Sequence, residues 1–178
     1  ENYHAKAKNN SNYTYAVDEH YYMEPEWFLA NTHFYDDYSR DVKVFSGEYA
    51  AHDKEVKEST KRNNWRCALS EAAFLTGVER NADVVYLASY APLFARIGYE
   101  QWAPDLIWFD DRTSYATPNY YVQQLYSDYT GKYTVNSELA GGEESGVYHI
   151  VSADEQGHLY VKLVNASDKD CLLYTSPS

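Results

Sequence analysis

The sequence predicts an α/β fold in which a parallel sheet with covering helices is followed by an antiparallel β domain. Over the first 130 residues, three apolar segments that fit strands alternate with segments that fit helices. Strands that are apolar throughout and separated by helices favour a parallel sheet covered on both faces. After residue 131 the apolar pattern changes to a period of two, which is typical of antiparallel hairpins.

The three predicted strands all end in polar or aromatic residues. They are TYAVDEHYY from Thr14 to Tyr22, KVFSGEYA from Lys43, and VVYLASYAPLF from Val84 to Phe94. The carboxyl ends of parallel strands meet at one edge of a sheet, and (β/α)₈ barrels carry their active sites at that edge. The polar residues that end these strands are therefore expected to lie on the functional edge.

Two helices are predicted between these strands. NNWRCALSEAAFLTGVERN carries apolar residues at helical spacing after an N-cap at Asn63 or Asn64. The segment from Glu24 to Ser39, with Pro25 in its first turn, is a less regular candidate between the first two strands. The expected buried stripe of the longer helix comprises Trp65, Ala68, Leu69, Ala72, Ala73 and Leu75.

A long loop and a further helix are predicted after the third strand. The segment from Gly98 to Tyr115 is aromatic and poorly periodic, so it is expected to be an ordered loop packed by Trp102, Trp108 and Phe109. Thr117 is the expected N-cap and Pro118 a first-turn residue of a helix that ends before Gly131.

The last part of the chain predicts the start of an antiparallel β domain. KYTVNSEL, GVYHIVSA and HLYVKLVN alternate apolar and polar residues, and a Gly-containing turn from Asp154 to Gly157 joins the last two. We expect three regions: residues 1–130 are part of a (β/α)₈ barrel, 131–170 are part of a β domain, and 171–178 are a non-native tail. A complete barrel takes about 250 residues, so the sequence is expected to be truncated on its N-terminal side.

Composition limits the classes of partner. The formal net charge of −12 disfavours nucleic acid and anionic membrane surfaces, which need clustered cations. Twenty tyrosines fit a protein that handles sugars, although tyrosines also simply pack strands and helices. With only Cys67 and Cys171, and no metal or nucleotide motif, we expect no cofactor and no metal. The sequence leaves secreted, periplasmic and cytoplasmic locations open.

Glu48 is the first candidate functional residue, because it is a single carboxylate at the end of an apolar strand, flanked by Gly47 and Tyr49. Two interpretations are open from its position. It is either a catalytic carboxylate or a buried acid that neutralises an arginine at the rim of the sheet. Asp18 and Glu19 cannot both face one substrate, since adjacent strand residues point to opposite faces, and one of them is expected to be structural.

The order and spacing of several segments resemble the α-L-arabinofuranosidases of glycoside hydrolase family 51, roughly from Tyr15 to Asn165. The segments are DEHYY, KVFSGEYA, ALSEAAFLTGVERNADVVYLASYAPLF, PDLIWFD and PNYYVQQLYS. The resemblance implies the C-terminal part of a (β/α)₈ TIM barrel, strands six to eight, followed by the start of a jelly-roll-like β-sandwich. It implies a retaining glycosidase that releases terminal α-L-arabinofuranosyl residues from plant hemicellulose or pectin oligosaccharides, in L-arabinose metabolism.

The resemblance also implies residue roles. Glu48 corresponds to the nucleophile, and Tyr22 to a tyrosine that orients it. The acid/base glutamate of the family falls upstream of Glu1, so the isolated chain is expected to be inactive. An amide that some members carry after strand eight is matched here by Pro92. The expected substrate-binding residues are His20, Tyr21, Tyr49 and Trp102.

The alternative function is an incomplete, non-catalytic carbohydrate-binding fragment of such an enzyme. His20 has an alternative too, as a histidine that hydrogen-bonds its neighbours at the barrel mouth without touching sugar. The expected partner is an arabinose-containing oligo- or polysaccharide. The full-length enzyme is a candidate homo-oligomer.

Overall fold

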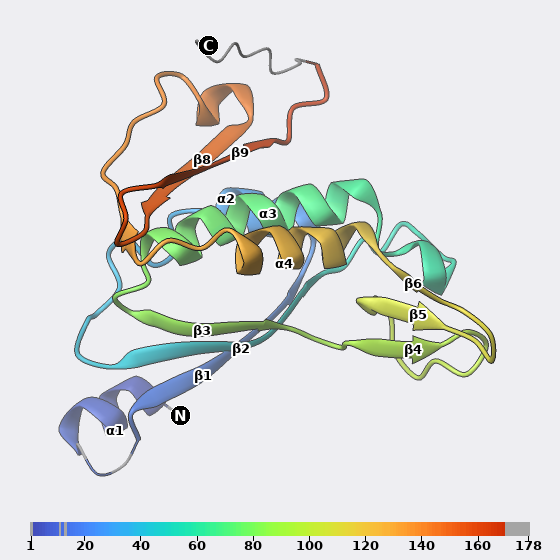
Figure 1. Ribbon diagram of the computed structural model, residues 1–178. Helices are drawn as coiled ribbons and strands as arrows, with labels where there is room; N and C mark the ends of the chain where they lie inside the picture. Colours follow the sequence, from blue (N-terminus) through green and yellow to red (C-terminus); the bar gives the residue numbers. More distant parts are fainter. Residues whose placement is uncertain (1, 11, 13, 170–178) are drawn as a thin grey trace.

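The computed structural model describes residues 2–10, 12 and 14–169 (Figure 1). The predicted non-native tail at 171–178 lies outside these residues. The helices are α1 Tyr3–Asn9, α2 Pro25–Ala30, α3 Trp65–Arg80 and α4 Pro118–Asp128, with 3₁₀ turns η1 Ser59–Lys61 and η2 Glu143–Ser145. The strands are β1 Ala16–Met23, β2 Lys43–Ala51, β3 Val85–Tyr90, β4 Phe94–Arg96, β5 Ile107–Phe109, β6 Ser114–Ala116, β7 Tyr133–Thr134, β8 Val147–Ala153 and β9 Leu159–Asn165.

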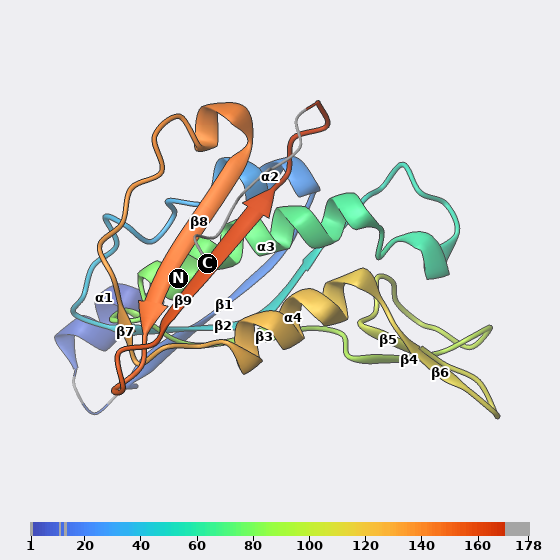
Figure 2. The same cartoon turned by 45° about the horizontal axis from the view of Figure 1, so that its top comes forward.

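The predicted parallel sheet is confirmed, with the strand order β1-β2-β3. Helices α2, α3 and α4 lie together on one of its faces (Figures 1 and 2). The core forms between them, around Val44 of β2, Phe28 of α2 and Phe74 of α3. The prediction of helices on both faces is wrong for the described residues, because no helix packs across the second face of this sheet.

Helix α3 begins as its sequence predicts, because the Asn64 side chain accepts a hydrogen bond from the Cys67 amide. Its buried surface is wider than the predicted stripe and extends from Cys67 to Val78. The reason is its position, since α3 contacts the parallel sheet, both flanking helices and the β8–β9 hairpin. Trp65 does not belong to the buried stripe and is 69% exposed at the first turn.

Two other segments differ from prediction. Helix α2 ends at Ala30, and turns continue to residue 37, yet Tyr35 in these turns is still buried in the core. The region expected to be a loop contains β5 and most of β6, which form a sheet with β4 just before it, and Trp108 is fully buried beside Ala95 and Ala103. Strands of three residues are too short to give a readable period, which is why the pattern resembled a loop.

The predicted antiparallel hairpin is also confirmed. Strands β8 and β9 pair from Val147↔Asn165 to Ala153↔Leu159, and β7 adds only two residues of the predicted KYTVNSEL strand. The Asp154 side chain accepts hydrogen bonds from the Gln156 and His158 amides, and Gly157 has a φ of +85°, which favours glycine.

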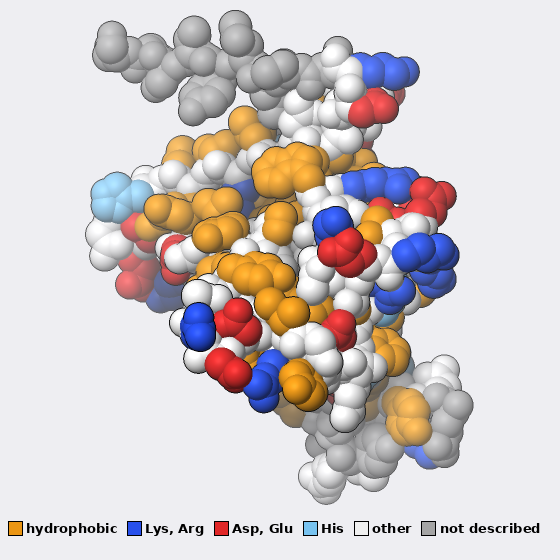
Figure 3. All heavy atoms as spheres, turned by 90° about the vertical axis from the view of Figure 1, so that its right-hand side faces the viewer, with side chains coloured by type: hydrophobic (Ala, Val, Ile, Leu, Met, Phe, Trp, Pro, Cys, Tyr) orange, Lys and Arg blue, Asp and Glu red, His pale blue; other side chains and the backbone are white. Residues whose placement is uncertain are grey.

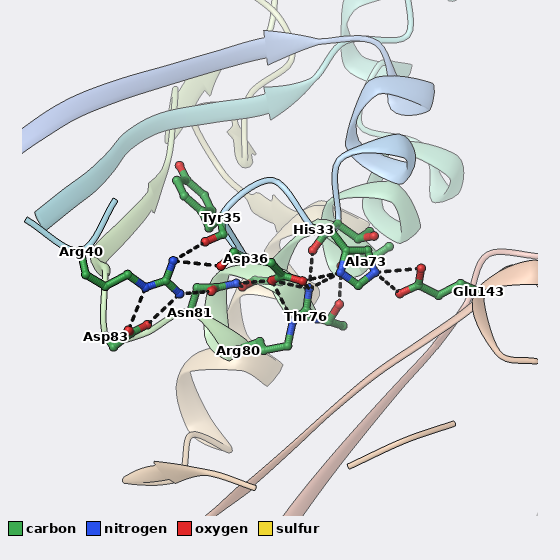
Figure 4. Close-up of polar contacts among 12 residues, drawn as sticks. His33, Tyr35, Asp36, Arg40, Ala73, Thr76, Arg80, Asn81, Asp83 and Glu143 are labelled. Atoms are coloured by element: carbon green, nitrogen blue, oxygen red, sulfur yellow. Dashed lines mark hydrogen bonds and ion pairs between the residues drawn. The ribbon is translucent and has the colours of Figure 1, made fainter. Parts of the chain in front are cut away.

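Polar contacts attach the hairpin sheet to α3. Lys162 of β9 donates to both Glu79 carboxylate oxygens, at 2.8 and 2.7 Å, and the Ser152 hydroxyl donates to the same side chain at 2.9 Å. A second connection runs from Glu143 to His33, whose Nε2 lies 2.8 Å from Glu143 Oε1 (Figure 4). His33 in turn contacts Asp36, which also pairs with Arg80.

Candidate active site

The carboxyl ends of β1, β2 and β3 point to the side of the molecule that carries β4–β6 (Figure 1). Figure 3 shows this side, where hydrophobic side chains lie between acidic and basic ones. In the β1–β2 ladder, Glu19 pairs with Ser46 and His20 pairs with Glu48, so Gly47 is an extra residue of β2. This irregularity puts His20 directly beside Glu48.

Glu48 and Tyr22 are brought together across the two strands. The Tyr22 hydroxyl donates to Glu48 Oε2 at 2.6 Å, and His20 Nδ1 lies 3.4 Å from the same oxygen. Burial raises the pKa of Tyr22, and the hydrogen bond to Glu48 and the charge of Glu48 raise it further. Tyr22 therefore stays protonated at neutral pH and acts as a fixed donor to the carboxylate.

Two more aromatic rings surround Tyr22. Its ring centroid lies 5.3 Å from that of His52 and 6.0 Å from that of Trp102, which is 53% exposed. Burial and the charges of Arg62 and Lys54 lower the pKa of His52, so its imidazole is neutral at pH 7. The sequence analysis assigns His52 no role. Its position directly after the end of β2, at the functional edge, is the feature that indicates one.

The structure does not bring Tyr21 and Tyr49 together with Glu48. Tyr21 faces the helices, where it stacks on Trp27 with the ring centroids 5.3 Å apart. Tyr49 is buried and donates to Gln123 of α4 at 2.6 Å. Each of them adjoins a residue, Tyr22 or Glu48, on the face of the sheet that has no helices, which we call the open face. Because successive side chains of a strand alternate between faces, Tyr21 and Tyr49 point toward the helices instead. Their expected contact with substrate is therefore at odds with their placement.

Asp18 and Glu19 point to opposite faces, as predicted. Glu19 lies on the helix side, where it accepts a hydrogen bond from Tyr35 at 3.1 Å and faces His4 Nε2 at 2.7 Å. The hydroxyls of Tyr21 and Tyr38 also donate to it. Asp18 lies on the open face, with its Oδ2 3.0 Å from His20 Nε2. Glu19 is thus the structural acid of the two.

Two further features concern the described residues. None of their His, Cys, Asp and Glu side chains form a group of three or more arranged to hold a metal ion, and none of their helices combines the length and the apolar content that a membrane span needs. Burial raises the pKa of Cys67 to about 12, which keeps this thiol protonated and unreactive. Glu48 is half-exposed and accepts a hydrogen bond from Tyr22, whose ring lies beside His52 and Trp102, and this arrangement suits a nucleophile for a neutral ligand.

Comparisons with known proteins show which family the chain resembles. The family model described as "Alpha-L-arabinofuranosidase C-terminal domain" matches residues 47–169. The chain is 53% identical over 123 residues to an extracellular exo-α-L-arabinofuranosidase of Streptomyces chartreusis, a match that covers 68% of this chain and 14% of that protein. It is 35% identical over 147 residues to α-L-arabinofuranosidase 2 of Arabidopsis thaliana, which covers 82% of this chain and 21% of that protein.

Solved structures give the same result. The arabinose-bound MgGH51 α-L-arabinofuranosidase superposes with a TM-score of 0.76 at 30% identity, over 85% of this chain and 26% of that one. The family 51 arabinofuranosidase of Xanthomonas axonopodis pv. citri shares the fold, with a TM-score of 0.65 at 16% identity, over 93% of this chain and 41% of that one. The chain therefore belongs to the α-L-arabinofuranosidases of glycoside hydrolase family 51, and its residues 47–169 match the C-terminal domain of those proteins.

Proposed function

We propose that this chain supplies the nucleophile of a retaining α-L-arabinofuranosidase, and that Glu48 is that nucleophile. The observation that carries the proposal is the hydrogen bond from Tyr22 to Glu48 at the carboxyl edge of a parallel sheet. A carboxylate held by a neutral donor keeps one oxygen oriented and the other free to attack. The relatives' names support the reaction class, although the chain spans only 14% and 21% of the length of the two curated relatives.

In the proposed reaction, a Glu48 oxygen attacks the anomeric carbon of a terminal α-L-arabinofuranosyl unit and forms a glycosyl ester. The bond to the leaving oxygen breaks, and a partner carboxylic acid about 5 to 5.5 Å away protonates that oxygen. The same partner then removes a proton from water, whose oxygen displaces Glu48 with retention. Tyr22 holds the attacking carboxylate in place. We assign the partner acid to a residue that precedes this chain in the full-length protein.

The fold is consistent with a barrel origin for the sheet. We propose that β1, β2 and β3 are strands six, seven and eight of a (β/α)₈ barrel, within a domain at residues 1–130. The barrel interior then corresponds to the face without helices, which carries Asp18, His20 and Glu48. Residues 131–170 then form part of a jelly-roll-like β-sandwich. Strand β9 supports this proposal. Its Lys162 and Val164 contact α3, whereas Leu159 and Val161 on the opposite face are 62% and 59% exposed, as expected of a sheet that packs against a second sheet.

The proposed substrate is a terminal arabinofuranosyl group on a plant hemicellulose or pectin oligosaccharide. A neutral sugar suits a site built from Tyr22, His52 and Trp102 in a chain with a net charge of −12. Trp102 offers an exposed ring for the apolar face of a sugar. The 178 residues alone, without the partner acid, are expected to bind such sugars without hydrolysing them, which is the behaviour of the alternative carbohydrate-binding fragment.

The test uses Glu48→Ala in the full-length protein with an aryl α-L-arabinofuranoside. We expect hydrolysis to fall to background, because no ester forms, while the matched surface variant Glu138→Gln stays at the wild-type rate. Azide, which is small enough to enter the vacated space, should restore release of the aryl group and give the inverted glycosyl azide. A retained azide product, or full activity without azide, rules out Glu48 as the nucleophile.

A further inference from the structure

Asp18 is a second carboxylate on the face that carries Glu48, and it contacts His20. The Asp18 side chain lies on the same open face of β1 as His20 and Tyr22, and its Oδ2 is 3.0 Å from His20 Nε2. His20 Nδ1 is 3.4 Å from Glu48 Oε2. The imidazole therefore spans two carboxylates, with one ring nitrogen directed at each.

Gly47 makes room for this arrangement. A Cβ on Gly47 would lie 2.1 Å from Asp18 Oδ1 and 3.0 Å from Asp18 Cγ. No side chain fits at such distances unless Asp18 moves away. The Ser89 hydroxyl of β3 donates to the Gly47 carbonyl at 2.5 Å, which fixes this part of β2. The extra residue in β2 thus serves two purposes: it aligns His20 with Glu48 and leaves space for the Asp18 carboxylate.

The direction of the hydrogen bonds gives the chemical consequence. A proton on His20 Nε2 is needed for a bond to the Asp18 carboxylate. A second proton on Nδ1 makes the contact with Glu48 attractive, whereas a lone pair there would face a carboxylate oxygen. Both contacts are hydrogen bonds at once only when each ring nitrogen carries a proton, and the Tyr22 hydroxyl is the other donor that faces Glu48.

A hydrogen-bond donor beside Glu48 acts unequally on the two steps of the proposed reaction. Glu48 loses its charge when the glycosyl ester forms, so the donor gives that step no help. When water attacks the anomeric carbon, the ester C–O bond breaks and its electron pair returns to Glu48, while the water proton goes to the partner base. An N–H group on His20 Nδ1 that points at Glu48 stabilises that returning negative charge.

We propose that Asp18 is a positioning residue of this site, which orients His20 toward Glu48 and thereby speeds the departure of Glu48 from the glycosyl ester. This inference rests on the proposed function. It assigns Asp18 to the second step in particular, and that assignment separates it from residues that only maintain the fold.

The experiment measures both steps in the full-length protein with 2,4-dinitrophenyl α-L-arabinofuranoside, whose good leaving group makes ester formation fast. For Asp18→Asn we expect the steady-state kcat to fall tenfold or more, by about the contribution of a hydrogen bond to a charged group. The pre-steady-state burst should keep its rate and reach one dinitrophenol per active site. The matched control is Asp37→Asn, an exposed aspartate outside the site, with unchanged kinetics.

Gly47→Ala provides a second variant, because its Cβ displaces the Asp18 carboxylate without removing it. It should show the same loss of kcat with the burst retained, and the double variant should be no slower than either single one. Unchanged kinetics for Asp18→Asn, an equal loss in burst and steady state, or additive losses in the double variant would overturn the role of Asp18. Failure of the wild-type protein to release dinitrophenol would instead overturn the proposed function.

Discussion

The Tyr22 hydroxyl and the Glu48 carboxylate lie 2.6 Å apart although the two residues are 26 positions apart in the sequence. The contact depends on the parallel pairing of β1 with β2 and on the extra residue at Gly47, which keep both side chains on the face without helices. Their immediate neighbours Tyr21 and Tyr49 bind partners on the opposite face. The paired strands β1 and β2 thus carry site residues on one face and core residues on the other.

Removing the Tyr22 hydroxyl should slow turnover. Tyr22→Phe keeps the ring against His52 and Trp102 but removes the donor to Glu48. A hydrogen bond to a charged group contributes about 1.5 to 3 kcal/mol, so we expect a loss of roughly 10- to 100-fold in kcat/KM in the full-length protein. Tyr121→Phe, at an exposed position on α4, is the control and should match wild type. Equal rates for Tyr22→Phe and wild type contradict the orienting role.

Trp102 should affect substrate binding more than chemistry. Its ring is exposed beside Tyr22 and His52, where it can stack on a sugar. Trp102→Ala is expected to raise KM by up to about tenfold, the range of one aromatic contact, with a smaller change in kcat. Trp65→Ala removes an even more exposed indole from α3 and should leave KM unchanged. A KM that does not move in Trp102→Ala contradicts a substrate contact.

Glu71 should make stability fall as pH rises. Burial raises the pKa of this α3 carboxyl to about 8, against a value of 4.5 for an ordinary glutamate. Between these two values the folded protein binds a proton that the unfolded chain has released, so this contribution is complete below pH 4.5 and is lost as pH rises toward 8.

Glu71→Gln should flatten that pH dependence, measured as the midpoint of thermal unfolding from pH 5 to pH 9. The substitution is tolerable because Asn119 Oδ1 is buried without a described partner, so the Asn119 amide can turn to accept from the new side chain. An unchanged slope of the midpoint against pH would mean that another group is responsible.

The Lys162–Glu79 pair should hold the β8–β9 hairpin on α3. Both side chains are nearly buried, with exposures of 11% and 12%. Removing one partner of a buried ion pair costs about 3 to 5 kcal/mol because the other charge stays unpaired. Lys162→Met in the full-length protein should therefore speed hydrogen exchange at β9 amides by at least tenfold. Lys132→Met, at an exposed pair with Glu155, should leave that exchange unchanged. Equal protection in both variants contradicts this attachment.

The sequence predicts the elements with strong local signals and misses those without them. The N-caps Asn64 and Thr117, the β8–β9 turn and the apolar β2 strand all follow from residue type and spacing. Strands β4–β6 are missed because each is only three residues long. The exposure of Trp65 depends on which elements surround α3, and that is a tertiary property which helical spacing alone does not contain.

The site residues, too, are only partly predictable from the sequence. The strand end predicts Glu48, the family resemblance predicts its pairing with Tyr22, and the structure brings the two together. The predictions for Tyr21 and Tyr49 fail because the sequence pattern does not show which side chains of each strand end face the helices and which face the site. Asp18 and His52 depend on the irregularity at Gly47 and on the packing of Trp102, neither of which has a sequence period.

Glu48 is expected to form the covalent bond to the sugar. The full-length protein should be incubated with a mechanism-based α-L-arabinofuranosyl inactivator, digested, and analysed by mass spectrometry of the peptide that contains SGEYA. We expect one arabinofuranosyl adduct per active site, located on Glu48, and no adduct in Glu48→Gln. An adduct on any other residue, or inactivation without a covalent adduct, would contradict it.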